Sequence, residues 1–262
     1  MAKLRRISIL IALGLLAGCG TIGSESPAVD TRSWDGVVRV DGILRAIMHE
    51  GETGTHVTLD TLLPNADLYA LGALTDLAGE ITVIGGQADL AYPQGVDSAR
   101  TERTRESSAG ATLLVAAEVP VWRALTTDEP IRFETLDEAI ERLATTAGMD
   151  LDARFPFLIE GDFEELEWHV IDGTRLAPGA ASHQDHLAAA VKASRAEASG
   201  TLIGFYSRHD QGVFTHMGSK THVHCVLDGP PASGHVGHVL VPAGATVRFP
   251  AMPAGPRERK AR

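Results

Sequence analysis

The stretch Lys220–Val241, KTHVHCVLDGPPASGHVGHVLV, places four histidines within 22 residues of an acidic chain. His222 and His224 lie two residues apart, so on a strand both imidazoles leave the same face, about 7 Å apart at the backbone. The turn residues GPPASG return the chain antiparallel, and His235 and His238 follow directly. Because these two are three residues apart, at most one of them joins the first pair. The pattern predicts a metal site built from two neighbouring strands.

Three neutral imidazoles can hold a divalent metal such as zinc while leaving positions open for water or substrate. That arrangement is typical of catalytic rather than structural metal sites. The same ligands also suit copper, nickel or iron. His216 lies upstream and could reach the same pocket, whereas His183 and His186 are expected on the surface of a helix. Cys225 follows His224 directly and therefore points to the opposite face of the strand, into the core.

The rest of the sequence predicts an α+β protein whose histidines lie in its last sheet. Gly85-Gly86 is expected to join two strands in a hairpin. Thr135 and Glu138 are expected to form a capping box on a helix that ends at Gly148. The expected elements are helices over 42–52, 57–64, 135–148 and 183–200, strands over 80–84, 87–92 and 112–119, a charged loop over 100–111, two strands around Gly161, and strands from 201 to 249.

Composition limits the class of function. The chain has 262 residues, of which 44% are hydrophobic, enough to bury the core of a globular protein. Its formal net charge of −11 argues against nucleic acid as a partner, because phosphate neutralisation requires a basic surface.

Residues 1–19 predict a bacterial lipoprotein signal. A basic start with Lys3 is followed by a short apolar segment and by Leu-Ala-Gly-Cys ending at Cys19. Cys19 is the expected site of lipidation, which would anchor the protein to the outer face of a membrane in the cell envelope. The expected organisation is this signal, a flexible linker over 20–33, one domain over 34–250 and a basic tail over 251–262.

Several motifs together resemble the α-acetolactate decarboxylase family. In that family a GTIVGF strand precedes a His-x-His strand, and a third metal histidine follows eleven residues later. This chain has GTLIGF at 200–205 and the same spacing from His224 to His235, so the resemblance implies zinc ligands His222, His224 and His235, with His238 in reserve. The stretch LYALGALTDLAGEITVIGG resembles the family's FGLGTFNALDGEMIVLDG and implies that Glu80 is catalytic.

The resemblance covers about Val38–Arg248 and implies a fold and a reaction. The implied fold is a two-part arrangement of mixed or antiparallel β-sheets with a few helices and the metal cleft between the parts. The implied reaction decarboxylates a small hydroxy-keto acid, 2-acetolactate, to acetoin, with metal polarisation and general acid–base catalysis. Family members commonly form homodimers through the N-terminal sheet.

Two departures from the family pattern keep other hypotheses open. Leu158 stands where the family's AIRIDG motif has a catalytic arginine, and no residue matches the family's C-terminal glutamate. Arg208 or His216 could substitute for the arginine in space. A second hypothesis is therefore a non-catalytic envelope lipoprotein that kept the histidine site and binds a metal or a small oxyacid. A third is a cupin-like barrel, although the glutamate expected after the histidine pair is absent.

Overall fold

The computed structural model describes residues 32–253. The predicted signal with Cys19, most of the linker, and residues 254–262 of the basic tail lie outside the described residues. Within the described range, no helix is long and apolar enough to cross a membrane.

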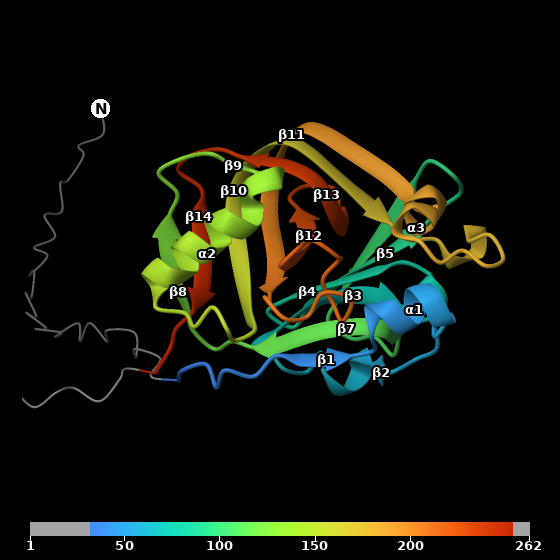
Figure 1. Cartoon of the computed structure of the whole chain (residues 1–262), viewed down its shortest axis with the longest axis horizontal. Helices are drawn as coiled ribbons and strands as arrows, with labels where there is room; N and C mark the ends of the chain where they lie inside the picture. Colours follow the sequence, from blue (N-terminus) through green and yellow to red (C-terminus); the bar gives the residue numbers. More distant parts are fainter. Residues whose placement is uncertain (1–31, 254–262) are drawn as a thin grey trace, which may run out of the picture. The chain divides into compact units, whose positions relative to one another are not determined.

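The first half of the described chain forms an antiparallel sheet in the order β1-β7-β3-β4-β5-β6, with β2 also paired to β7 (Figure 1). Its strands are β1 (Arg39–Asp41), β2 (Val57–Thr58), β3 (Leu68–Leu74), β4 (Glu80–Ile84), β5 (Gln87–Pro93), β6 (Ala99–Thr104) and β7 (Gly110–Glu118). The predicted hairpin is confirmed, because β4 and β5 pair across Gly85-Gly86 with Ile84 opposite Gln87.

The second half forms another antiparallel sheet in the order β8-β14-β10-β11-β12-β13-β9. Its strands are β8 (Trp122–Thr126), β9 (Ile131–Arg132), β10 (Phe155–Val170), β11 (Val191–Tyr206), β12 (Thr221–Leu227), β13 (Ser233–Val241) and β14 (Thr246–Pro250). Because β10 also pairs with β13, the strands β10, β11, β12 and β13 close into a ring. This closure brings the far end of β10 beside the histidines.

Within residues 32–253, three α-helices accompany the sheets: α1 (Leu44–Glu50), α2 (Leu136–Ala147) and α3 (His183–Ala189). Helix α2 ends as predicted, with Gly148 in the left-handed conformation at φ 84°. The predicted capping box is wrong, because the Thr135 side chain makes no cap and instead donates to the Arg132 carbonyl. Short 3₁₀ helices are η1 (Leu59–Thr61), η2 (Thr75–Leu77), η3 (Phe133–Thr135) and η4 (Gly173–Arg175).

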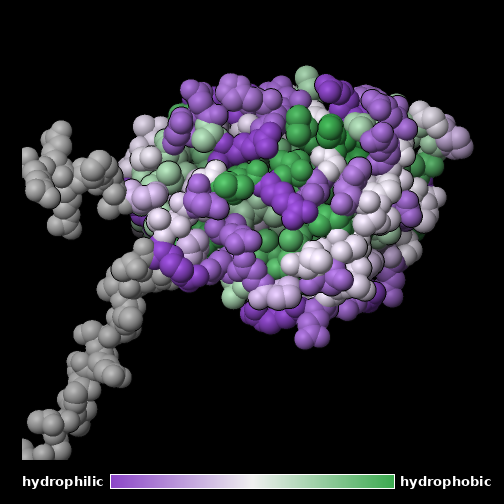
Figure 2. Space-filling model, turned by 90° about the horizontal axis from the view of Figure 1, so that it is seen from below, coloured by the Kyte–Doolittle hydropathy of each residue, from purple (hydrophilic) through white to green (hydrophobic). Residues whose placement is uncertain are grey.

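Side-chain alternation gives the first sheet two different faces. On β4, Ile81 and Val83 belong to an apolar cluster that also includes Leu59 of η1. Glu80 and Thr82 therefore point to the opposite face, against which β12 and β13 of the second sheet lie. Hydrophobic side chains also gather in the middle of the face seen from below, with hydrophilic ones around them (Figure 2).

Several predicted elements are wrong in extent. A single strand, β10, replaces the two strands expected around Gly161, which pairs with Gly200 in the middle of a continuous ladder. The helix expected to end at Gly200 stops at Ala189, and β11 begins at Val191. Pairing with β10 along its whole length outweighs the local helix propensity of this segment.

Two further segments differ from expectation. Much of the expected charged loop is the edge strand β6, and charged side chains are well suited to an unpaired sheet edge. The helix expected over 57–64 is the short strand β2 followed by one 3₁₀ turn. The predicted fold class is nevertheless confirmed: two antiparallel sheets with few helices.

Candidate metal centre

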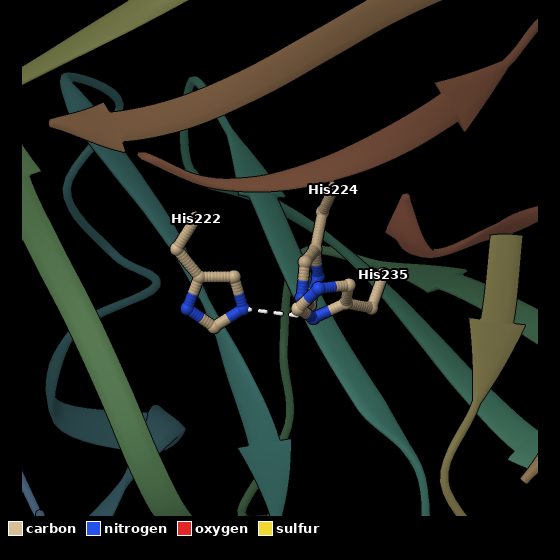
Figure 3. Close-up of side chains that lie close together, drawn as sticks. All are labelled: His222, His224 and His235. Atoms are coloured by element: carbon tan, nitrogen blue, oxygen red, sulfur yellow. Dashed lines mark hydrogen bonds between the residues drawn. The ribbon is translucent and has the colours of Figure 1, made fainter. Parts of the chain in front are cut away.

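Strands β12 and β13 bring three imidazoles together (Figure 3). His222 and His224 leave the same face of β12, and His235 on β13 is the direct cross-strand partner of His224. One ligand nitrogen from each of the three lies within 4.8 Å of the others. His222 and His224 are 5% and 0% exposed, so their nitrogens have little access to bulk water. We call these three residues the triad.

The next histidine along β13 is not part of this group. His238 points away, with its ring nitrogens 3.5 Å from the carboxylates of Glu134 and Glu165. The structure thus places His235, and not His238, with the His222/His224 pair.

Hydrogen bonds orient the triad for binding through defined atoms. His222 Nδ1 donates to the Phe214 carbonyl over 2.8 Å, so its lone pair is on Nε2 in the neutral ring. His224 Nδ1 lies 3.0 Å from the Thr82 hydroxyl, which can accept its proton and leave the Nε2 lone pair free. This contact ties the first sheet to the second at the site.

The converging nitrogens of the triad suit a metal ion. His224 Nε2 is buried and has no hydrogen-bond partner among the described residues, which is costly unless another group binds it. His222 Nε2 lies 3.0 Å from His235 Nδ1 (Figure 3). Two imidazole nitrogens that converge beside an unsatisfied third form a donor set that zinc and similar metals accept.

Burial keeps the triad neutral. Desolvation lowers the pKa of His222 to about 3, and neighbouring histidines add to the effect. The pKa values of His224 and His235 lie well below the usual range for the same reasons. Neutral imidazole is the form that ligates a metal, so the site is ready to bind at pH 7.

Glu80 faces the triad from β4. Its Oε1 accepts a hydrogen bond from the Ile171 amide over 3.1 Å, and its Oε2 lies 3.7 Å from His224 Nε2. The side chain is almost completely buried, and desolvation raises the pKa of its carboxyl to about 8 in the metal-free protein. The carboxyl is therefore protonated at neutral pH, which is the form of a general acid.

Sequence reasoning missed His169, near the end of β10. It is the cross-strand partner of His235, and the two rings stack with centroids 4.7 Å apart. Burial lowers its pKa to about 4. No local motif marks this residue, because it reaches the site only through the pairing of β10 with β13.

Two cavities meet at the triad. An inner cavity contacts His222, His235 and Glu80 and has a largely apolar wall that includes Ile47 and Leu113. A side cavity reaches His235 along Glu134, Asp137 and Glu138. The residues that line both cavities are His169, His183, Leu187, His216 and His235.

Several sequence expectations change with this geometry. His183 and His186 lie on helix α3, with His183 exposed as expected, but His183 also lines both cavities and His186 lines the inner one. Leu158 is buried in the main core and lines neither cavity, so its side chain would not contact a ligand bound in either one. Arg208 does not take the place of the family's catalytic arginine, because its guanidinium binds Glu141 and it lines neither cavity. Cys225 is fully buried, as predicted.

The chain matches the family model described as alpha-acetolactate decarboxylase over residues 41–253. No curated protein sequence matches the chain in a sequence search. The structure is similar to alpha-acetolactate decarboxylase from Bacillus subtilis strain 168, at a TM-score of 0.63 and 12% identity, covering 82% of this chain and 86% of that one.

A second similar structure is a Staphylococcus aureus protein of unknown function, described as similar to alpha-acetolactate decarboxylase. Its TM-score is 0.62 at 16% identity, with 81% of this chain and 84% of that chain covered. At these identities the structural likeness establishes the fold, and the match of the family model carries the assignment to a family. Both decide against a cupin-like barrel.

Proposed function

Because this chain belongs to the alpha-acetolactate decarboxylase family, we propose that it is a divalent-metal-dependent carboxy-lyase. Its substrate would be a small hydroxy-keto acid, with conversion of 2-acetolactate to acetoin as the candidate reaction. The observation that carries the proposal is the triad of converging imidazole nitrogens, with the buried carboxyl of Glu80 3.7 Å from His224 Nε2.

The proposed ligands are His222, His224 and His235. A bound divalent ion, zinc for example, would supply Lewis-acid polarisation of the substrate's oxygen atoms. The chain's own residues prepare for it: the Phe214 carbonyl and the Thr82 hydroxyl hold the first two rings with Nε2 turned to the centre. These contacts restrict ring rotation, which favours binding.

Glu80 is the proposed general acid. Loss of carbon dioxide breaks a carbon–carbon bond, leaves the electron pair on the substrate, and requires one proton to complete acetoin. The Ile171 amide occupies Oε1, so the proton is available from Oε2, the oxygen that faces His224. Desolvation, which raises the pKa of this carboxyl in the metal-free protein, favours the protonated form that a general acid needs.

The remaining walls orient the substrate and exclude water. Ile47, Leu77, Leu113 and Ile171 line the inner cavity and offer contacts to methyl groups. His169 lies beside His235 and offers a hydrogen bond to a polar substituent. An apolar wall with a few convergent polar groups is the usual character of a small-molecule site.

One observation favours a second candidate function. Among the described residues, neither cavity that reaches the triad is lined by lysine or arginine, so a substrate carboxylate would meet no fixed cation. A non-catalytic protein that binds the metal itself, or a small ligand through the metal, would need no lysine or arginine in the cavity.

An assay for acetoin released from 2-acetolactate separates the two functions. The purified chain would be stripped with a chelator, resupplied with zinc, and compared with His235→Ala and with His238→Ala on the same strand. The lyase proposal expects zinc-dependent acetoin release by the wild type and by His238→Ala, and none by His235→Ala. Zinc binding without acetoin release would favour the binding function.

The homodimer implied by the family would pair through the N-terminal sheet. The apolar area in the middle of the face seen from below supports this proposal (Figure 2). Light scattering on the purified chain should then report twice the mass of one chain. The mass of one chain at all protein concentrations would exclude the dimer.

A further inference from the structure

A second pair of histidines lies on the solvent side of the triad. His183 is the first residue of α3, and His216 belongs to the segment between β11 and β12. Their ring centroids are 4.2 Å apart, although the residues are 33 positions apart in sequence. We call His183 and His216 the outer pair.

Local structure holds each member of the outer pair in place. Ser182 and Asp185 form a capping box, so the turn that carries His183 is fixed from both directions. Before His216, the Asp210 carbonyl accepts hydrogen bonds from the backbone amides of residues 213, 214 and 215. The Asp210 carboxylate in turn binds the Arg154 guanidinium through two hydrogen bonds of 2.6 and 2.7 Å. The pair is thus a feature of the fold rather than a chance contact of two long side chains.

The ring nitrogens of the outer pair are available to a ligand. Within residues 32–253, neither His183 nor His216 makes a side-chain hydrogen bond, whereas His186 Nδ1 bonds to the Ser182 carbonyl. Burial and neighbouring histidines lower the pKa values of both His183 and His216, so both rings are neutral at pH 7. Neutral imidazoles with free nitrogens are ligands for divalent transition metals.

The surroundings favour a cation. Both members of the outer pair line the side cavity together with the carboxylates of Glu134, Asp137 and Glu138. No lysine or arginine lines that cavity among the described residues, although Arg45 lines a neighbouring pocket on the other side of the outer pair. The chain carries a formal net charge of −11. A divalent ion at the outer pair would therefore be attracted by the wall that faces it.

The outer pair is close to the triad but distinct from it. The His216 ring centroid lies 5.4 Å from that of His235 and 6.3 Å from that of His222. The three triad nitrogens already converge on one another. An ion held by the outer pair would therefore occupy a second position, nearer the mouth of the cavities.

We propose that His183 and His216 bind a second divalent transition-metal ion beside the one held by the triad. Two protein ligands leave its other positions open, so the ion is exchangeable and can accept an oxygen ligand. Its charge would neutralise a carboxylate entering a site whose walls offer no lysine or arginine. That last role rests on the proposed lyase function, whereas the metal site itself does not.

Counting bound zinc tests the proposal. The full chain would be stripped of metal and titrated with Zn²⁺ by calorimetry, with bound zinc counted at saturation by equilibrium dialysis. We expect about two ions per wild-type chain, about one in His183→Ala/His216→Ala, and about one in His222→Ala/His224→Ala. The control His209→Ala changes an exposed histidine away from the cavities and should keep both ions.

The variants separate failure of the outer site from failure of the triad. A wild type that binds one ion, lost only in the triad variant, overturns the outer site and leaves the triad intact. Two ions retained in the outer variant would also overturn it. The calorimetric titration should show two binding phases, of which the weaker belongs to the outer pair with its two ligands. If the double variant does not fold, His183→Ala alone, at an exposed position, should remove this weaker phase. An unchanged phase in that variant contradicts the proposal.

Discussion

Glu80 and Thr82 illustrate how single residues set up the site. They lie two positions apart on β4, so alternation sends both side chains toward the second sheet. Thr82 contacts His224 Nδ1, and Glu80 approaches Nε2 of the same ring. The buried His224 imidazole thus has a neighbour at each ring nitrogen, Thr82 at Nδ1 and Glu80 at Nε2. Nε2 has no hydrogen-bond partner among the described residues and can bind a metal.

Glu80→Gln tests the role of the carboxyl with little change in shape. The amide cannot deliver a proton, so acetoin release should fall about a hundred- to ten-thousand-fold, the usual range for losing a general acid. Zinc content should stay close to that of the wild type. Glu118→Gln, at an exposed position on β7, is the matched control. Full activity in Glu80→Gln would remove Glu80 from the mechanism.

The buried histidines predict sensitivity to acid. Burial lowers the pKa values of His169 and His216 to about 4, from an ordinary value of 6.5. Between those values the unfolded chain binds protons that the folded chain does not, so stability falls as the pH drops from 6.5 toward 4. Thermal melts of chelator-treated protein should show this loss, with a shallower slope in His216→Gln. Equal slopes in both proteins would contradict the burial of His216.

The residues of the site differ in how far sequence could predict them. His222, His224 and His235 follow from strand alternation, a tight turn and the family spacing. Glu80 required the family resemblance, because a glutamate after a glycine has no local signal. His216 was expected as a residue that could reach the pocket, and it lines both cavities. His169 and His183 could not be placed, because each reaches the site through contacts between segments distant in sequence.

At the scale of elements, β10 and β11 are the main departure from expectation. Gly161 and Gly200 resemble a turn and a helix end, but they pair with each other inside the ladder. A Cβ atom on Gly200 would lie 2.3 Å from the Val226 carbonyl oxygen of the neighbouring strand. This glycine therefore permits close approach of two strands, a reason that local sequence does not reveal.

Gly200→Ala tests that reading of the ladder. The added methyl group must displace the β12 backbone, so the free energy of unfolding should fall by about 1–3 kcal/mol, the cost of overpacking. Gly54→Ala is the control, since nothing lies within 4 Å of the Cβ that it would carry. Urea titration followed by circular dichroism measures both. Equal stability of the two variants would mean that the strands do not meet this closely.

For the whole molecule, the fold class could be predicted from the sequence, but the order of the strands in the sheets could not. Alternation and turn residues predict several of the strands, among them β4, β5, β7 and β12. The ring of β10 to β13 depends on pairing between residues such as His169 and His235, which are 66 positions apart. The site exists only because that ring and β4 of the other sheet meet.

The predicted lipid anchor concerns the chain as a whole, and Cys19 lies outside the described residues. Expressed in a bacterium that processes lipoproteins, the full chain should fractionate with membranes and incorporate labelled fatty acid. Cys19→Ser should abolish labelling and shift the protein to the soluble fraction. Labelling that persists in the variant would exclude Cys19 as the anchor.

The central claim is that one divalent metal ion lies among the three triad histidines, facing Glu80. Anomalous X-ray diffraction at the zinc edge, from crystals of the chain grown with Zn²⁺, tests it most directly. We predict a peak within bonding distance of His222 Nε2, His224 Nε2 and His235 Nδ1. Zinc density elsewhere in the crystal with none between these three nitrogens would contradict the claim.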